Sequence, residues 1–239
     1  MNAARYPRVL VTGASRGLGA ALSARFASLG HRVLMAARDG AELMRRAESL
    51  RAAGAQVETC AVDLSQRADC ARLAAQAQQL MGGVDVLVNN AAIGPYRPFL
   101  DNDDESLEQL LALNLAAPMR LARALLPGML AQRRGWIINV ASDLARRPLA
   151  NMAPYVASKY GLLGFGASLH RELRASGIRV CSVLPGIIDS SFNGATEGSK
   201  EACWAMKTEP LAARIADLLS LPDELVIDEF AIHPVEGDY

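Results

Sequence analysis

Two side chains that can move a proton lie four residues apart within residues 153–174. If this segment is helical, Tyr155 and Lys159 lie on the same face, one turn apart. An unperturbed phenol has a pKa of about 10, and a neighbouring positive charge lowers it. The pair therefore predicts a tyrosine suited to proton transfer near neutral pH. A Tyr and a Lys also meet at this spacing by chance, so other parts of the chain must support the interpretation.

A glycine-rich turn is the second chemical signal, and it joins a predicted strand at 8–12 to a predicted helix at 15–29. Gly13 permits a tight turn, Gly17 lets the backbone approach a pyrophosphate, and Gly19 permits close packing of helix on strand. The N-terminus of the helix offers free amides and a partial positive charge. We expect cofactor phosphates to bind here, although many such turns use glycine for geometry only.

Alternating strands and helices position these signals. Strands are predicted at 8–12, 32–36, 57–62, 84–89, 135–142, 178–184 and 225–232. Helices are predicted at 15–29, 41–53, 67–81, 103–129, 153–174 and 211–220, the fourth of them interrupted at Pro118 and Pro127, and 187–207 is a looser segment. Mostly continuous apolar strands indicate a parallel sheet covered on both faces. The predicted fold is α/β, a doubly wound Rossmann-type three-layer fold with a mostly parallel seven-stranded sheet, and residues 1–239 form one domain.

Composition argues against several other classes of protein. Basic and acidic residues both number 25 and the net charge is zero, which argues against nucleic-acid partners and an acidic-membrane surface. No apolar run approaches the roughly 18 residues of a membrane span, and the segment before the first strand is too short for a signal peptide. The four cysteines show no metal-type spacing. We expect them to be reduced and mostly buried, in a cytoplasmic protein without a metal.

Five motifs in chain order resemble those of the short-chain dehydrogenase/reductase family, and they extend along nearly the whole chain. The glycine turn resembles the family's TGxxxGxG motif, and residues 89–92 are similar to its NNAG motif. The others are Asn114 in an LNL context, Ser142 thirteen positions before the YxxxK pair Tyr155 and Lys159, and Pro185-Gly186 after the sixth predicted strand.

The resemblance implies hydride transfer between a nicotinamide and the carbonyl or secondary alcohol of a small substrate. Tyr155 is then the general acid in reduction and the base in oxidation. Lys159 lowers the pKa of that tyrosine and hydrogen-bonds the nicotinamide ribose. Ser142 donates to the carbonyl oxygen, and Asn114 holds a water that links Lys159 to solvent.

Charge after the second predicted strand favours NADP(H) over NAD(H). The position where an acid would accept from the 2′-hydroxyl of NAD is Ala37, and Arg38 follows it. Arg16 is a second cation that can reach a 2′-phosphate, although both arginines could be ordinary surface cations. The other implied cofactor contacts are Gly13, Ser15, Gly17, Leu18, Gly19, Asp63, Leu64, Asn90, Ala91, Ala92, Tyr155, Lys159, Pro185, Gly186, Ile188 and Ser190.

Some residues leave alternatives open. Ala92 stands where the family has glycine, and its methyl group could crowd the loop. Asp143 could face the substrate, but a turn residue is the preferred interpretation. Arg146 and Arg147 could clamp a substrate carboxylate, but a solvated surface pair is preferred. Arg133-Arg134 could dock an acyl carrier protein, although such a pair more often complements a helix dipole.

The substrate class stays open among 3-oxo or 3-hydroxy acids, ketones and 3-oxoacyl compounds. A non-catalytic NADP(H)-binding redox sensor is the alternative function, but such a protein would not need Tyr155. By resemblance, the helices around Asn114 and Tyr155 pack across a two-fold axis in a homodimer or homotetramer. Leu162, Leu163, Phe165 and Leu169 supply apolar surface for this interface or belong to the core.

Overall fold

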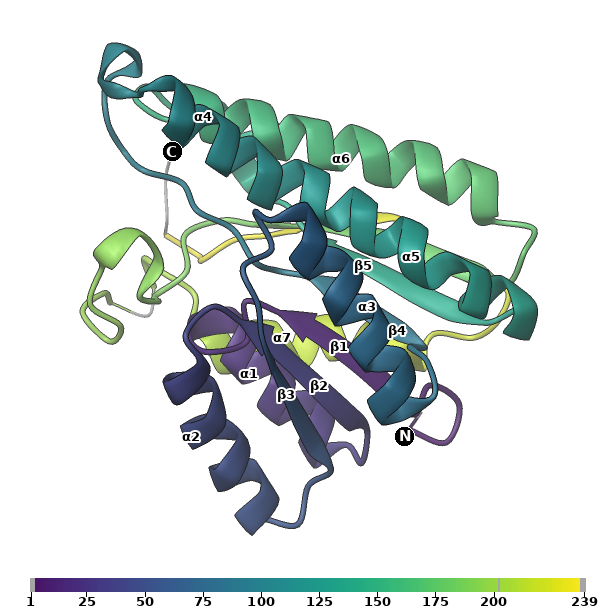
Figure 1. Cartoon of the computed structure of the whole chain (residues 1–239). Coiled ribbons are helices and arrows are strands. Elements are labelled where there is room, and N and C mark those ends of the chain that lie inside the picture. Colours follow the sequence, from purple (N-terminus) through teal and green to yellow (C-terminus); the bar gives the residue numbers. More distant parts are fainter. Residues whose placement is uncertain (1–2, 202, 237–239) are drawn as a thin grey trace.

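A parallel sheet of seven strands lies at the centre of the computed structural model, which describes residues 3–201 and 203–236. The strands run in the order β3-β2-β1-β4-β5-β6-β7, and every pair is parallel (Figure 1). They are β1 (Arg8–Thr12), β2 (Arg32–Ala37), β3 (Val57–Ala61), β4 (Val86–Asn89), β5 (Gly135–Val140), β6 (Ile178–Pro185) and β7 (Glu229–Ile232). The order reverses between β1 and β4, which confirms the predicted doubly wound fold.

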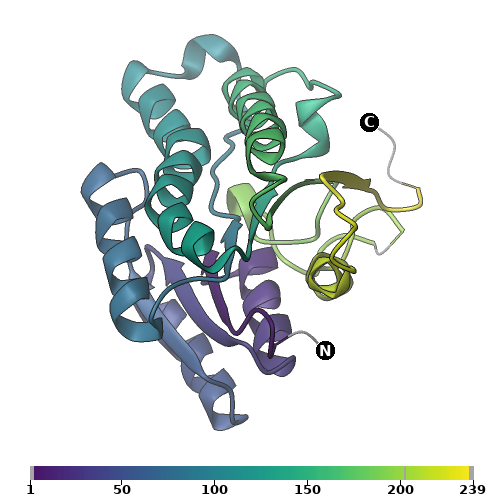
Figure 2. The same ribbon diagram turned by 90° about the vertical axis from the view of Figure 1, so that its right-hand side faces the viewer.

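Helices cover both faces of the sheet, giving three layers (Figures 1 and 2). One face carries α1 (Gly17–Ser28), α2 (Gly40–Ala52) and α7 (Thr208–Asp217), and the other carries α3 (Arg67–Met81), α4 (Asp104–Leu111), α5 (Ala117–Gln132) and α6 (Ala153–Leu173). Short helical turns are η1 (Phe99–Asp101), η2 (Ala112–Ala116), η3 (Asp143–Ala145), η4 (Phe192–Gly194) and η5 (Leu218–Ser220). The connection between β6 and α7 forms a yellow-green lobe in Figure 1.

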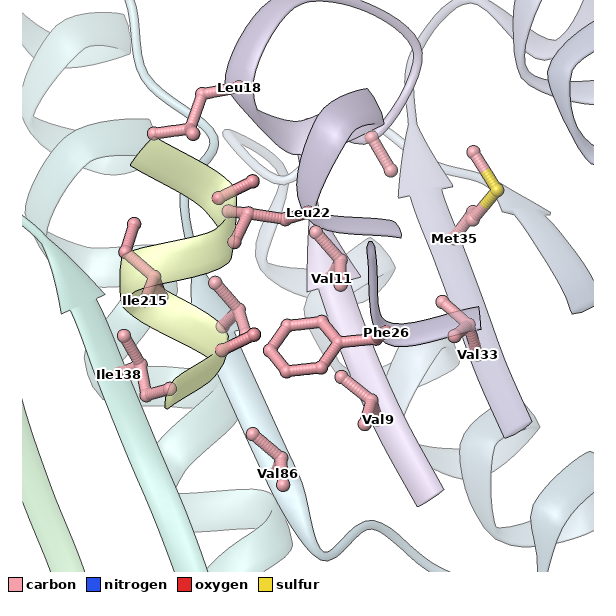
Figure 3. Packing of buried hydrophobic residues seen from close by; sticks show 14 of the residues in the cluster. Val9, Val11, Leu18, Leu22, Phe26, Val33, Met35, Val86, Ile138 and Ile215 are labelled. Atoms are coloured by element: carbon pink, nitrogen blue, oxygen red, sulfur yellow. The ribbon is translucent and has the colours of Figure 1, made fainter. Parts of the chain in front are cut away.

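Strand alternation divides the core between the two faces. Val9 and Val11 of β1 point to the face of α1 and α7, whereas Leu10 belongs to the cluster on the other face. On α1, Leu22 and Phe26 lie one turn apart and are fully buried over the sheet (Figure 3). This packing fixes α1 on the end of β1, so the turn between them has a defined position.

The predicted interruption of helix 103–129 at both prolines is wrong at Pro127. The helix continues through α4, η2 and α5 from Asp104 to Gln132, with Pro127 inside α5. A proline removes one backbone hydrogen bond, but Leu125 and Met129 on either side are buried and keep the helix packed. Just before Pro118 the helix widens to the π turn η2, in which the Ala117 amide donates to the Ala112 carbonyl five residues earlier.

The same helix corrects a second expectation. The stretch from Asp104 to Gln132 is long and apolar enough to cross a membrane by length and composition alone. Almost half of its most apolar window is buried within the fold, where α5 packs against α3 through Leu121 and Met129. The core therefore accounts for the buried part of its apolar residues, whereas Leu111 and Met119 remain exposed.

The last strand is shorter than predicted. Residues 225–227 were expected to begin it, but their side chains are exposed and β7 starts at Glu229. The last helix starts at Thr208 rather than 211, and a short turn, η5, completes it. Cys60, Cys70 and Cys181 are buried and free, as expected, and Cys203 is partly exposed and free.

A buried ion pair fixes the edge of the sheet opposite the strand carboxyl ends. Asp85, fully buried before β4, accepts from the backbone amide of Arg8 at 3.0 Å and from its Nε and Nη2 at 2.8 Å each. Arg134 Nη2 lies 3.4 Å from the same carboxylate. The charge of Arg134 is therefore partly balanced by Asp85, which leaves less positive charge at Arg133-Arg134 for an acyl carrier protein.

Replacing Asp85 by asparagine is expected to lower the free energy of unfolding by about 3 kcal/mol, because it leaves the Arg8 guanidinium without its buried counter-charge. Urea unfolding followed by circular dichroism measures the loss. The matched control is Asp217→Asn, which removes the carboxylate of an exposed pair with Arg214 and is expected to change stability little. Equal losses in the two variants would contradict the assignment.

Candidate active site

A cavity of about 980 Å³ opens at the carboxyl ends of β1, β2, β4, β5 and β6. This edge includes the point where the strand order reverses, which is where doubly wound sheets bind ligands. The predicted site residues that line it are Gly13, Ser15, Arg16, Gly17, Leu18, Gly19, Arg38, Asn90, Ala91, Ala92, Ser142, Tyr155, Lys159, Pro185, Gly186, Ile188 and Ser190. Asn114, Asp63 and Leu64 are not among the lining residues in the described part of the chain.

Helix α6 carries the two residues predicted to move a proton. Tyr155 lies in its first turn and Lys159 one turn later, and both side chains are buried. The Lys159 Nζ lies 5.5 Å from the centre of the Tyr155 ring and donates to the Val140 carbonyl at 2.8 Å. The end of β5 therefore holds the amine beneath the phenol ring.

Burial changes the charge expected at Lys159. Complete removal from water lowers the pKa of Lys159 from its ordinary value of 10.5 to about 7. Near neutral pH the amine therefore exchanges between charged and neutral forms. Support of a Tyr155 phenolate by this amine requires its protonated form, and the sequence alone did not predict that burial opposes this form.

The Tyr155 ring is held from two sides. A Cβ on Gly94 would lie 2.5 Å from the ring, so only glycine lets the loop after β4 pack this closely. The Phe192 ring lies 5.9 Å away, centre to centre, and comes from the lobe after β6. Sequence reasoning missed Gly94 and Phe192, because nothing local marks a contact between loops so far apart in the chain.

Two hydrogen bonds between Asn193 and Gly94, which we call the clasp, join these two loops. The Asn193 Oδ1 accepts from the Gly94 amide at 3.3 Å, and its Nδ2 donates to the Gly94 carbonyl. Asn193 has a φ of 56°, a left-handed conformation that asparagine tolerates better than most residues. The clasp places Phe192 over Tyr155 and closes one side of the cavity.

Asn114 lies in the π turn and is almost fully buried. Its Oδ1 accepts from the Ile93 amide at 3.0 Å, and its Nδ2 donates to the Ile93 carbonyl at 2.7 Å and to Ser158 Oγ at 3.1 Å. Ser158 Oγ in turn donates to the Tyr155 carbonyl at 2.7 Å. The Asn114 side chain thus ties the loop after β4 to the first turn of α6.

Ser142 follows β5 and faces the cavity with a nearly buried side chain. Its Oγ accepts from the Leu144 amide at 3.1 Å, which starts the short turn η3. A hydroxyl that accepts in this way keeps its own proton for donation. Ser142 is therefore suited to bind an oxygen that becomes negative.

The charged residues after Ser142 point elsewhere. Asp143 is buried outside the cavity walls, with His233 Nε2 at 3.6 Å and Arg147 Nη1 at 3.9 Å. Arg146 pairs with Glu229. Asp143 is thus part of a turn, as preferred, and neither arginine lines the cavity as a carboxylate clamp would.

The glycine turn has the shape predicted for it. Gly13 and Gly17 have φ values of 65° and 52°, in the left-handed region. A Cβ on Gly19 would lie 2.1 Å from the Gly13 carbonyl oxygen, so this position requires glycine. Helix α1 has no side-chain cap and no acid in its first turn, so its N-terminal amides are available to an anion.

Asn90 follows β4, the neighbour of β1 in the sheet, and its hydrogen bonds hold the glycine turn in place. Its Nδ2 donates to the Thr12 carbonyl at 2.9 Å, and its backbone amide donates to Thr12 Oγ1 at 2.9 Å. The Ala91 amide donates to the same hydroxyl at 3.1 Å. Residues after β4 therefore hold the loop after β1, and both loops line one cavity.

The part of the cavity at the carboxyl ends of β1 and β2 is lined by both cations and acids. Arg16 and Arg38 are exposed, and neither has a carboxylate partner within residues 3–201 and 203–236. Asp39 and Glu42 also line this end and were missed, although an Asp three residues before a Glu is a helix-start pattern. Asp39 accepts from the Glu42 amide at 3.0 Å. Arg45 hydrogen-bonds the Glu42 carboxylate and lowers its pKa to about 2, so both acids are engaged locally.

The predicted adenine contacts lie away from this wall. Asp63 Oδ1 accepts from the Ser65 amide at 3.0 Å and from its hydroxyl at 2.8 Å. Leu64 is buried in the core beside α3. Contact of either residue with a nucleotide stays a prediction.

Comparison with known proteins adds independent information. A family model described as short chain dehydrogenase matches residues 7–201. The chain is 41% identical over 184 residues to a 1-deoxy-11-beta-hydroxypentalenate dehydrogenase from Streptomyces exfoliatus, covering 76% of this chain and 67% of the relative.

Two solved structures superpose along nearly the whole chain. A metagenomic short-chain oxidoreductase in complex with NADP gives a TM-score of 0.84 at 36% identity, over 95% of this chain and 96% of that one. A variant of actinorhodin polyketide ketoreductase with NADPH gives 0.88 at 27% identity, over 98% of both chains.

Proposed function

Because this chain belongs to the short-chain dehydrogenase/reductase family, we propose that it transfers a hydride between NADP(H) and the carbonyl or secondary alcohol of a small substrate. One observation carries the proposal. Tyr155, Lys159 and Ser142 line the same cavity as a glycine turn shaped for phosphates. A proton donor, an oxygen-binding hydroxyl and a dinucleotide cradle therefore share one space.

The residues at the glycine turn fit a phosphorylated dinucleotide. The free amides at the start of α1 suit a pyrophosphate, and the two positive-φ glycines let it approach the backbone. Arg16 and Arg38 suit a further phosphate, because guanidinium matches its geometry. NADPH, when bound, supplies the hydride. The NADP and NADPH held by the two solved structures support this choice over NAD(H).

The proton comes from the protein. In reduction the carbonyl carbon gains the hydride, and the Tyr155 hydroxyl gives its proton to the carbonyl oxygen, so the product is a secondary alcohol. Ser142 donates a hydrogen bond to that oxygen, where negative charge develops. The Lys159 ammonium stabilises the phenolate left behind. Oxidation of the alcohol reverses each step.

Asn114 acts in this proposal as a positioning residue. Its side chain is fully engaged with Ile93 and Ser158, which orients the first turn of α6 and hence Tyr155. The water that the family resemblance implies at Asn114 stays a prediction.

The test of the proposed function is NADPH oxidation, followed by absorbance, with a panel of ketones, oxo acids and oxo esters. Turnover of a carbonyl compound with formation of its alcohol supports the enzyme. Tight NADPH binding without turnover of any compound in a broad panel would favour a redox sensor instead. The arrangement of Ser142, Tyr155 and Lys159 around one cavity favours the enzyme.

Replacing Arg38 by aspartate is expected to lower the ratio of kcat/KM for NADPH over NADH by about 100-fold, because a phosphate partner becomes a repelling carboxylate. Steady-state kinetics with both cofactors measures the ratio. Arg123→Asp, an exposed change on α5 outside the cavity, is the charge-matched control and is expected to leave the ratio unchanged. An unchanged ratio in the Arg38 variant would remove Arg38 from 2′-phosphate binding.

The predicted homodimer or homotetramer stays a prediction. Leu162 and Leu169, two of the four apolar residues considered for its interface, are buried in the single chain. Leu111, Met119 and Tyr160 are instead exposed by 44%, 44% and 46%, on α4, α5 and α6 respectively. We propose these three as the apolar surface available for association.

A further inference from the structure

The cavity has an apolar end around Tyr155, which we call the substrate end. It is lined by Ile93, Tyr96, Leu144, Leu149, Met152 and Phe192. These residues come from the loops that follow β4, β5 and β6. We call the part of the cavity lined by Arg16 and Arg38, after β1 and β2, the cofactor end.

Contacts among these residues show that they surround the proton donor. Met152 and Tyr155 belong to one buried cluster, and Ile93 and Leu144 pack against it. Phe192 packs on the Tyr155 ring from the lobe after β6. The Tyr96 hydroxyl accepts from Asn151 Nδ2 at 3.4 Å, which joins the loop after β4 to the segment before α6. A carbonyl compound placed against Tyr155 therefore meets hydrocarbon on several sides.

Three arginines lie close in sequence to the residues of the substrate end, and each of them contacts another group of the protein. Arg97 donates to Asn102 Oδ1 and to Ser106 Oγ, both at 2.9 Å, and lies outside the cavity walls. Arg146 and Arg147 face Glu229 and Asp143.

The two lysines that line the cavity are also engaged. Lys159 Nζ donates to the Val140 carbonyl beneath the ring. Lys200 Nζ donates to the Ile188 carbonyl at 3.3 Å, beside the loop that faces the glycine turn. Both lysines can still carry a charge, but Lys159 lies beneath the Tyr155 ring and Lys200 beside Ile188, and neither is among the apolar residues named above for the substrate end.

We propose that the substrates are neutral ketones with at least one large alkyl or aryl substituent, and that this site disfavours free oxo acids. This inference rests on the proposed function. A carboxylate placed against these apolar side chains would exchange part of its water for hydrocarbon, and no arginine lines this end among the described residues. An ester or an aryl group would instead bury apolar surface there. Of the classes left open by the sequence, the structure thus favours ketones and neutral oxo esters.

The test compares methyl 4-acetylbenzoate with 4-acetylbenzoate, using the whole protein and NADPH. Both carry the same ketone and differ in one charge, and their reduction rates with borohydride correct for intrinsic reactivity. We expect kcat/KM to favour the ester by about 100-fold after correction. A corrected ratio within about threefold of unity, or a preference for the acid, would overturn the inference.

A matched pair of variants tests whether missing positive charge causes the preference. Leu149 is 45% exposed, so a lysine there keeps its ammonium in water while reaching the cavity. Leu149→Lys is expected to raise kcat/KM for the acid by about tenfold, whereas Leu149→Gln, which adds polarity without charge, is expected to leave the preference for the ester. Equal behaviour of the two variants would contradict the role of charge.

The outcomes separate this inference from the proposed function. Comparable reduction of ester and acid refutes the apolar preference and leaves the oxidoreductase intact. If NADPH binds and neither compound, nor any ketone of the broader panel, oxidises it, the proposed function fails and this inference fails with it.

Discussion

Replacing Tyr155 by phenylalanine is expected to lower kcat/KM for carbonyl reduction by about 1,000-fold while NADPH still binds. The substitution removes the hydroxyl that donates the proton and keeps the ring that packs against Gly94 and Phe192. Stopped-flow or steady-state NADPH oxidation measures the loss. Fluorescence titration measures cofactor affinity, which we expect to stay within about twofold of that of the unmodified protein.

Tyr160→Phe is the control for this prediction. Tyr160 lies on the same helix, is 46% exposed and is outside the cavity walls, and phenylalanine keeps the ring proposed for association, so the same chemical change there is expected to leave turnover intact. Retention of more than about a tenth of the activity in the Tyr155 variant would exclude this hydroxyl as the proton donor. Loss of both activity and NADPH binding would instead indicate a structural defect.

Replacing Lys159 by methionine is expected to change the pH dependence of stability. Burial lowers the pKa of Lys159 to about 7, whereas the unfolded chain binds the same proton up to about pH 10.5. Between these values the unfolded state holds more protons, so the free energy of unfolding of the unmodified protein rises with pH. Below pH 7 both states are charged and the cost of burying the ammonium is complete.

Methionine carries no proton, so its variant lacks this rise. Its stability relative to the unmodified protein is therefore expected to be highest near pH 6 and to fall toward pH 10, by about 4 kcal/mol. Urea unfolding of both proteins across this range gives the difference, in which other titrating groups cancel. A difference that is flat with pH would show that Lys159 titrates alike in the folded and unfolded states.

A direct measurement is also accessible. The chain has only three lysines, at 159, 200 and 207. Carbon-13 labelling of the lysine side chains gives three signals, and loss of one in the Lys159 variant assigns it. The midpoint of that signal tests the lowered pKa without unfolding the protein.

The sequence predicted most of the fold because its strands are short, apolar and bounded by glycines or turns. All seven predicted strands overlap observed ones, and the glycine turn has the expected conformation. Errors arose where packing overrides local preference. Pro127 stays within a helix because its neighbours are buried, and residues 225–227 form no strand because no partner strand pairs with them.

The family motifs predicted residues from separate loops that line one cavity, whereas side-chain contacts could be predicted from the residues alone only between positions close in the chain. The pairing of Tyr155 with Lys159 follows from one turn of helix. The clasp between Asn193 and Gly94 joins residues 99 positions apart, and no local pattern could predict it. The lowered pKa of Lys159 likewise depends on burial by the whole fold.

The origin of the cavity walls has a consequence for the history of this protein. The cofactor end is built by the turns after β1 and β2 together with the first residues after β4 and β6, and the substrate end by later parts of the connections after β4, β5 and β6. Mutations that accumulate in those later parts can exchange one carbonyl compound for another while the dinucleotide cradle is inherited unchanged. Divergence of specificity and conservation of redox chemistry are therefore compatible on a single scaffold.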